Sequence, residues 1–173
     1  MDAVLILDGD GASSLSDDFG VRLLALLAEK GYRSETVTLW RREVAPCRGC
    51  LLCLTKHPGR CVVRDVVAEL KWRMHCNPGS GVTVFITPVR FGHFSSVIKN
   101  AVDRGVGSHV LQVFLGYGVD IDDEEKRTFI DLIARHRGSA DIVHPGMDGE
   151  VLVFVATCVE DNAAICESLR ARL

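Results

Sequence analysis

Five short runs, four of them mainly apolar and one with alternating polar and apolar residues, are separated along this chain by segments whose apolar residues recur at helical spacing. The runs cover residues 3–8, 34–40, 82–89, 109–115 and 151–156. Short, nearly continuous apolar runs are typical of strands buried on both faces, whereas the alternation of polar and apolar residues over 34–40 favours an edge strand. Strands that alternate with helices form an open parallel sheet that is covered on both faces. The sequence therefore predicts an α/β fold in one domain, residues 1–173.

The predicted helices are bounded by residues that favour helix ends. The first ends at Gly31, and the third begins at Ser95 and ends at Gly105, as the cap preferences of serine and glycine indicate. The other three are expected over residues 65–75, 122–138 and 161–173. The helix over 122–138 opens with acidic and closes with basic residues, which is the order that the helix dipole favours. Residues 141–149 are expected to form a loop.

The charge pattern argues against nucleic acid and a membrane surface as partners. The 173 residues carry a net charge of −3, and acidic and basic residues are interspersed, which produces too weak a field to attract a polyanion. No apolar run approaches the roughly 20 residues of a membrane span, and the first residues do not resemble a signal peptide. We therefore expect a cytoplasmic protein, in which the seven cysteines are reduced rather than paired.

Four of the cysteines are crowded into one loop, residues 41–64. They are spaced C-x2-C-x2-C-x7-C and are Cys47, Cys50, Cys53 and Cys61. Four thiolates at this density suit a four-iron, four-sulfur cluster or a structural zinc site. Three thiols at successive two-residue intervals resemble iron–sulfur ligands more than the paired arms of zinc modules. The sequence favours iron–sulfur and leaves zinc and a metal-free loop as alternatives.

Ligands of open parallel sheets bind beyond the carboxyl ends of the strands, at the point where the strand order reverses. Three segments leave predicted strands at that edge, and they cover residues 9–16, 87–94 and 116–122. The first contains glycines and serines that can donate hydrogen bonds to a phosphate. It contains no lysine or arginine, however, and it is surrounded by four aspartates, Asp8, Asp10, Asp17 and Asp18. An acidic rim of this kind disfavours a dianionic phosphate.

The second segment combines a proline, a glycine and two aromatic residues directly before a helix start. Phe91 and Phe94 would be able to stack on a flat ring, and the N–H groups at the helix start can meet its polar edge. A plain strand-to-helix turn with two core aromatics is the alternative interpretation.

With these motifs in this order, the chain resembles the NADPH-dependent FMN reductase and iron–sulfur flavoprotein family. The resemblance lies within the first 105 residues. It rests on the first loop, on residues 46–53 leading to Cys61 and Asp65, and on residues 87–92 followed by Ser95, Ser96, Lys99, Asp103 and Arg104. It implies a flavodoxin-like three-layer sandwich around a five-stranded parallel sheet in the order 2-1-3-4-5. Residues 3–8 would be central, between 34–40 and 82–89.

The resemblance also implies a cofactor and its binding residues. The phosphate of FMN would lie against Asp10, Gly11, Ser13, Ser14 and Ser16. The edge of the isoalloxazine ring would lie against Thr87, Pro88, Val89, Arg90, Phe91 and Gly92. The far side of the ring would be closed by Gly116, Tyr117 and Gly118. The four clustered cysteines would ligate a 4Fe–4S cluster, and Arg90 would supply the positive charge that the first loop lacks.

The function that this resemblance implies is that of an FMN-dependent oxidoreductase or electron-transfer flavoprotein, assembled as a homodimer or homotetramer. Its partners would be a nicotinamide or protein electron donor and an acceptor that the sequence does not identify. No catalytic acid or base is predicted, because flavin electron transfer does not require one. The alternative is a flavodoxin-like interaction protein whose cysteine loop holds zinc or no metal.

Overall fold

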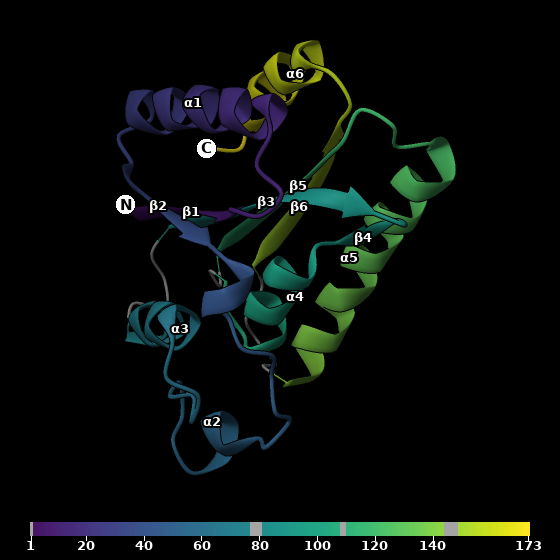
Figure 1. Cartoon of the computed structure of the whole chain (residues 1–173). Helices are drawn as coiled ribbons and strands as arrows, with labels where there is room; N and C mark the ends of the chain where they lie inside the picture. Colours follow the sequence, from purple (N-terminus) through teal and green to yellow (C-terminus); the bar gives the residue numbers. More distant parts are fainter. Residues whose placement is uncertain (1, 77–80, 108–109, 144–148) are drawn as a thin grey trace.

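A computed structural model describes residues 2–76, 81–107, 110–143 and 149–173, and it contains a parallel sheet between two helical layers (Figure 1). The five parallel strands are β1 (Asp2–Asp8), β2 (Arg33–Leu39), β3 (Val82–Arg90), β5 (Leu111–Tyr117) and β6 (Glu150–Ala156). They lie in the order β2-β1-β3-β5-β6. This is the predicted order 2-1-3-4-5, with β1 between β2 and β3 and with β2 at one edge, so the α/β fold prediction is confirmed.

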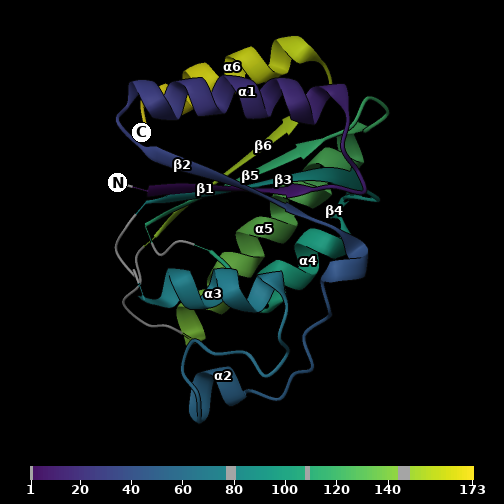
Figure 2. The ribbon, with the colours of Figure 1, turned by 60° about the vertical axis from the view of Figure 1, so that its left-hand side comes forward.

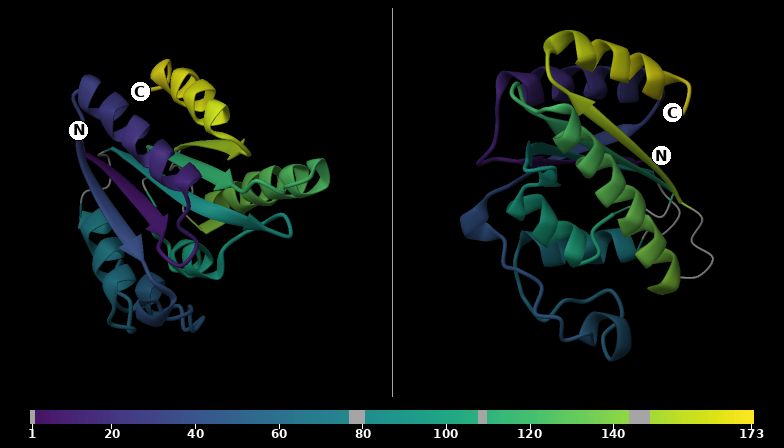
Figure 3. Two further views of the ribbon diagram at one scale, coloured as in Figure 1. Left: turned by 45° about the horizontal axis from the view of Figure 1, so that its top comes forward. Right: turned by 90° about the vertical axis from the view of Figure 1, so that its right-hand side faces the viewer.

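Helices cover both faces of the sheet (Figure 2). On one face, α1 (Ser14–Glu29) and α6 (Val159–Arg170) lie side by side (Figure 3). The other face is covered by α3 (Val66–Cys76), α4 (Ser96–Asp103) and α5 (Asp123–Val143). None of the helices in the described ranges is both long and apolar enough to cross a membrane.

The central strand β3 shows why the core has two halves. Successive side chains of a strand point to opposite faces of the sheet. Val84 and Ile86 therefore pack in the cluster beneath α1 and α6, whereas Phe85 packs in the cluster beneath α4 and α5. There the rings of Phe85 and Phe114 stack with their centroids 4.7 Å apart. Burial on both faces explains the nearly continuous apolar run that identified this strand in the sequence.

A short antiparallel strand, β4 (His93–Phe94), pairs with the end of β3 and was not predicted. A two-residue turn, Phe91-Gly92, joins the two strands. Both turn residues have positive φ, 52° for Phe91 and 69° for Gly92, which is the sign that a type I′ hairpin turn requires. A strand of two residues carries no periodic pattern, so sequence reasoning could not find it.

The predicted helix caps are confirmed. Gly31 and Gly105 follow α1 and α4 with φ of 79° and 73°. The next residue in each case donates back into the helix, Tyr32 to the Leu27 carbonyl at 2.8 Å and Val106 to the Ala101 carbonyl at 3.1 Å. This is the hydrogen-bond pattern of a Schellman motif.

Three predicted boundaries are corrected. The helix expected to end at residue 138 continues to Val143 as α5. Glycine and basic residues favour the end of a helix, but they do not prevent the helix from continuing. Residues 141–143 are thus helical and not a loop, and residues 144–148 lie outside the described ranges. The last helix begins at Val159 rather than 161, because Asp161 caps it from its third position. The fourth predicted strand is described from Leu111 and extends to Tyr117, while its predicted first residue, 109, lies outside the described ranges.

The cysteine loop, residues 41–64, connects β2 to α3 and extends away from the sheet (Figures 1 and 2). It contains a 3-10 helix η1 (Arg41–Glu43) and the one-turn helix α2 (Leu52–Thr55). After α3 the chain returns to the middle of the sheet as β3.

Candidate functional site

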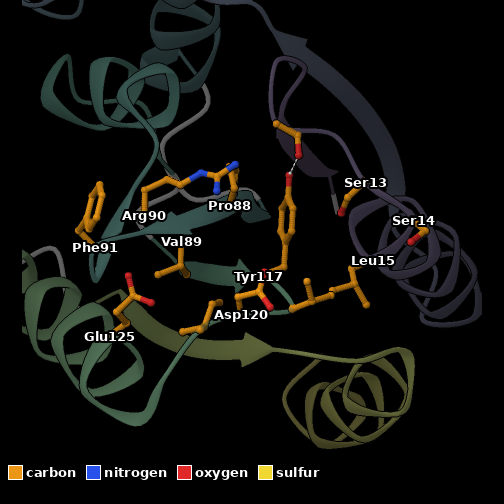
Figure 4. Close-up of a pocket in the computed structure, with 14 residues that line it drawn as sticks. Ser13, Ser14, Leu15, Pro88, Val89, Arg90, Phe91, Tyr117, Asp120 and Glu125 are labelled. Carbon is orange, nitrogen blue, oxygen red and sulfur yellow. Dashed lines mark hydrogen bonds between the residues drawn. The ribbon is translucent and has the colours of Figure 1, made fainter.

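A cavity of about 380 Å³ opens at the carboxyl ends of β1, β3 and β5 (Figure 4). It lies where the strand order reverses between β1 and β3, which is where this type of sheet places its ligand. The volume is within the roughly 300–1,000 Å³ that is typical of small-molecule and cofactor sites. The residues that line it come from the loop after β1, the first turn of α1, the end of β3, the end of β5 with the loop after it, and the first turn of α5.

The cavity brings together residues from all three groups that the sequence analysis proposed for FMN. The members that line it are Gly11, Ser13, Ser14, Pro88, Val89, Arg90, Phe91, Tyr117 and Gly118. Figure 4 shows Tyr117 standing between the first loop and the end of β3, with its hydroxyl directed at the loop. Segments separated by about a hundred residues in the sequence therefore form one site.

Five proposed residues do not line the cavity, and two of them belong to the first loop. The carboxylate of Asp10 accepts a 2.6 Å hydrogen bond from the Arg41 N–H. Ser16 is buried, and its hydroxyl donates to the Ser13 carbonyl while it accepts from the Ser13 N–H. These residues hold the loop and the start of α1 in place.

The other three lie on β3, its turn and β5. Thr87 is buried, and its hydroxyl accepts the Ser95 N–H at 2.9 Å. Gly92 packs so closely on α5 that an added Cβ would lie 2.5 Å from Thr128. At Gly116 an added Cβ would lie 2.5 Å from Val89 and 2.8 Å from Phe129, on the α5 side of the sheet. All three permit close packing instead of facing a ligand.

Sequence reasoning missed several residues of the cavity wall, which are Leu15, Val119, Asp120, Ile121 and Glu125. Leu15 and residues 119–121 lie within the segments 9–16 and 116–122 that were expected to reach this edge, so their position was available from the topology. Glu125 belongs to the first turn of α5. Only the packing of that helix on the sheet places it here.

The first loop satisfies most of its own polar groups. The buried carboxylate of Asp8 accepts the N–H groups of Asp10 and Gly11, at 2.9 and 3.1 Å. The Tyr117 hydroxyl donates to the Gly11 carbonyl at 2.7 Å. The N–H groups of Ser14 and Leu15 open α1 and have no acceptor within the helix. Hydrogen-bond donors for an anion are thus concentrated at the start of α1, beside the cavity.

The charge of the first loop is less exposed to the cavity than the sequence suggests. The Asp8 carboxylate is turned inward to the N–H groups of its own loop, and the Asp10 carboxylate accepts the backbone N–H of Arg41. The guanidinium of Arg22, 2.8 Å from Asp18, lowers the pKa of that carboxyl and neutralises it. The cavity itself still contains two acidic residues, Asp120 and Glu125.

Arg90 is the basic residue that lines this cavity, and it has no salt-bridge partner among the residues that the structure describes. Its charge acts on the phenol of Tyr117. Burial raises the pKa of Tyr117 to about 12, and Asp8 and Asp17 act in the same direction, whereas Ser16 and Arg90 oppose the rise. An unpaired cation beside a buried hydroxyl is suited to an anionic ligand group.

Phe91 stands at the mouth of the cavity and is 93% exposed. Its left-handed backbone is unusual for a large side chain, and such strain is concentrated at functional sites. Because the neighbouring Gly92 is fixed against α5, the turn holds Phe91 outward.

The four cysteines of the loop are free thiols, with Cys47 and Cys50 exposed and Cys53 and Cys61 partly buried. Their chemistry suits a thiolate-ligated metal centre. Within the described ranges, however, no three histidine, cysteine or acidic side chains gather as a metal site. The predicted convergence of the four sulfur atoms is thus not seen in this arrangement of the loop.

No family model matches the chain. Curated relatives do match about half of it. One is an iron–sulfur flavoprotein of Methanocaldococcus jannaschii, 35% identical over 81 residues, or 47% of this chain and 39% of the relative. Another is an iron–sulfur flavoprotein of Methanosarcina thermophila, 30% identical over 83 residues, or 48% and 41%. The chain spans about two fifths of the length of these relatives. The resemblance to iron–sulfur flavoproteins is thereby confirmed.

Solved structures match nearly the whole chain. The NAD(P)H:quinone oxidoreductase from Methanothermobacter marburgensis superposes with a TM-score of 0.68 at 16% identity, over 98% of this chain and 95% of that one. An azoreductase from Bacillus anthracis superposes with a TM-score of 0.61 at 13% identity, over 99% and 98%. The chain has a flavodoxin-like fold. At sequence identities of 13–16%, this likeness shows the fold of the chain and not its activity.

Proposed function

We propose that this flavodoxin-like protein is an FMN-dependent oxidoreductase that takes electrons from NAD(P)H. The observation that carries the proposal is the cavity at the carboxyl ends of β1, β3 and β5, which the three predicted FMN segments line together. The sequence relatives are named iron–sulfur flavoproteins, and the structural neighbours are named as NAD(P)H-dependent or azo-reducing enzymes. Assembly as a homodimer or homotetramer is part of the same proposal, and light scattering measures it.

The residues present fit FMN. The hydroxyls of Ser13 and Ser14, the N–H groups that open α1 and the Arg90 guanidinium would hold the phosphate. Backbone groups from Pro88 to Phe91 and from Gly118 to Ile121 would face the ring. Bound FMN would supply hydride and single-electron transfer, while the protein orients it and sets its potential through hydrogen bonds.

The test of this proposal compares FMN with riboflavin, which lacks the phosphate. Arg90→Ala should weaken FMN binding about ten- to a hundredfold, because a charge-assisted hydrogen bond contributes roughly 1.5–3 kcal/mol. Riboflavin binding should change little. Fluorescence titration measures both affinities, and Arg42→Ala is the control, since Arg42 is 81% exposed and lies outside the cavity.

Equal losses for the two ligands would place Arg90 at the ring and not at the phosphate. The absence of FMN binding by the unmodified protein would overturn the proposal and favour the interaction protein.

We also propose that Cys47, Cys50, Cys53 and Cys61 ligate an iron–sulfur cluster, for which the loop would have to bring the sulfur atoms closer together than this structure does. The density of thiols and the names of the relatives support this assignment. Replacing any one of the four by serine should lower the iron content of anaerobically purified protein, whereas Cys166→Ser should not. Zinc or no metal in the unmodified protein would contradict it.

A further inference from the structure

A buried ion pair lies where the cysteine loop joins the rest of the molecule. Arg104 is the residue directly after α4, and Asp65 is the residue directly before α3. Their side chains are 1% and 11% exposed, and the Arg104 guanidinium lies 2.5 Å from the Asp65 carboxylate. The other ion pairs among the described residues are much more exposed. We call this pair the clasp.

The clasp binds both ends of the cysteine loop. One terminal nitrogen of Arg104 donates to the Ala45 carbonyl at 3.2 Å, and the other donates to the Val63 carbonyl at 3.3 Å. The Asp65 carboxylate accepts the Ala45 N–H at 3.1 Å and caps α3 through the Ala68 N–H at 3.0 Å. Ala45 lies two residues before Cys47, and Val63 lies two residues after Cys61. A single guanidinium therefore joins the two stems that carry the first and last clustered cysteines.

The loop between these stems has little packing of its own. Of residues 46–62, only Gly59 is buried, and the one helix in this part, α2, has four residues. A segment with so few buried contacts depends on its attachment points for a defined position. The clasp is the attachment point that touches both ends.

The clasp is not explained by stability alone. Desolvating two charges is costly, and well-packed apolar residues often stabilise a protein at least as well as a buried ion pair. The Nε atom of Arg104 is moreover buried without a hydrogen-bond partner within the described residues. What the guanidinium provides, and an apolar side chain cannot, is directional binding to two separate carbonyls.

We propose that Arg104 and Asp65 are positioning residues that set the separation of the two loop stems, and hence of Cys47 and Cys61, for metal binding. The metal part of this inference rests on the proposed function of the cysteine loop. The attachment of the loop to the end of α4 does not.

The experiment removes the bridge while keeping the length of the side chain. Arg104→Met should increase amide hydrogen exchange over residues 45–64 about ten- to a hundredfold, as expected for the loss of charge-assisted hydrogen bonds. Anaerobic titration with Co²⁺ alone, followed by its visible absorption, should show a comparable loss of affinity. FMN affinity should stay within about twofold of the unmodified protein. Lys99→Met is the matched control, because Lys99 forms an exposed ion pair with Asp103 on the same helix.

The conservative variant separates bridging from charge. Arg104→Lys keeps the positive charge but cannot bind two carbonyls in a fixed geometry, so it should behave like Arg104→Met. Full rescue by lysine, or unchanged exchange in Arg104→Met, would overturn the proposal. If Arg104→Met does not fold, Asp65→Asn breaks the same pair and should show the same pattern. If the unmodified protein binds no Co²⁺, the proposed metal site is wrong. The hydrogen-exchange measurement alone then tests whether the clasp positions the two loop stems.

Discussion

At the scale of single residues, Phe91 is one of two non-glycine residues in the described ranges, with Leu51, that have a left-handed backbone. A left-handed backbone costs roughly 1–2 kcal/mol for a residue with a Cβ, and Phe91 recovers little of this because it is 93% exposed. Asparagine and glycine are the residues that this type of turn favours. A role in contacting a ligand would explain why a strained, exposed aromatic residue stands at the mouth of the cavity.

Replacing Phe91 by asparagine should therefore stabilise the protein. Relief of about 1 kcal/mol of turn strain should raise the Tm by roughly 2–4 °C in a chain of this size. Differential scanning calorimetry measures the change. Phe91→Leu keeps a large apolar side chain in the same conformation and should show no such gain. A lower Tm for Phe91→Asn would mean that the aromatic ring contributes to folding after all.

Tyr117 should titrate late. Its pKa is raised to about 12 by burial, above the value of about 10 that an unfolded tyrosine has. The folded state thus holds this proton more tightly, so the corresponding stability is fully present below about pH 10 and is lost as the pH rises through about 12. Near-ultraviolet absorbance should show a late phase that Tyr117→Phe removes and Tyr32→Phe retains. Absence of this late phase from the unmodified protein would contradict this.

At the scale of elements, α4 connects the cavity to the cysteine loop. Its first turn is fixed to the cavity segment, since the Ser95 N–H donates to Thr87 at 2.9 Å and the Ser95 hydroxyl accepts from Ile98 at 3.3 Å. Its other end carries Arg104 and the clasp. A helix of eight residues is too short to be stable alone, so both ends depend on these caps and on packing.

Loss of the Ser95 cap should therefore be measurable. Ser95→Ala should lower the free energy of unfolding by about 1 kcal/mol, within the usual range for an N-cap serine. Urea denaturation measures this, and Ser96→Ala is the matched control, because Ser96 is exposed on the first turn of the same helix. Equal effects of the two substitutions would show that the cap contributes little.

At the scale of the whole molecule, two hydrogen-bonded carboxylates should set its acid sensitivity. Asp65 joins segments 39 residues apart, whereas Asp161 accepts N–H groups at the start of its own helix, α6. Burial opposes ionisation of Asp65, but the Arg104 hydrogen bond and the N–H groups of Ala45 and Ala68 outweigh it and lower its pKa. The N–H of Thr157 does most to lower the pKa of Asp161, against some burial. Both groups are more acidic in the folded than in the unfolded state.

Stability should accordingly fall in acid. For a lowered folded pKa, the contribution is present above the unfolded value of about 4 and is lost as the pH falls through the folded pKa. Urea midpoints should be nearly constant from about pH 7 to pH 5 and should decrease below about pH 4. Asp65→Asn should reduce stability at neutral pH and make the decrease of the urea midpoint below about pH 4 smaller. If the urea midpoint of Asp65→Asn decreases below about pH 4 as much as that of the unmodified protein, the effect belongs to other carboxylates.

The amino-acid sequence by itself determined the order and type of the main elements. Apolar runs and helical spacing are local properties, and so is the cap chemistry of Gly31, Ser95 and Gly105, which the structure confirms. Since parallel strands end at a common edge, the sequence also indicated the three segments that meet at the cavity. The two-residue strand β4 and the continuation of α5 to Val143 escaped because neither depends on a local pattern.

Only the tertiary structure decided which residues of those segments face the cavity. Gly116 and Tyr117 are neighbours on β5, yet Gly116 packs beneath α5 and Tyr117 reaches the loop after β1, because successive residues of a strand point to opposite faces. Arg104 meets Asp65 across 39 residues of sequence. Contacts of this kind depend on how helices pack on the sheet and on which buried polar groups must find partners, and no local spacing of residues encodes them.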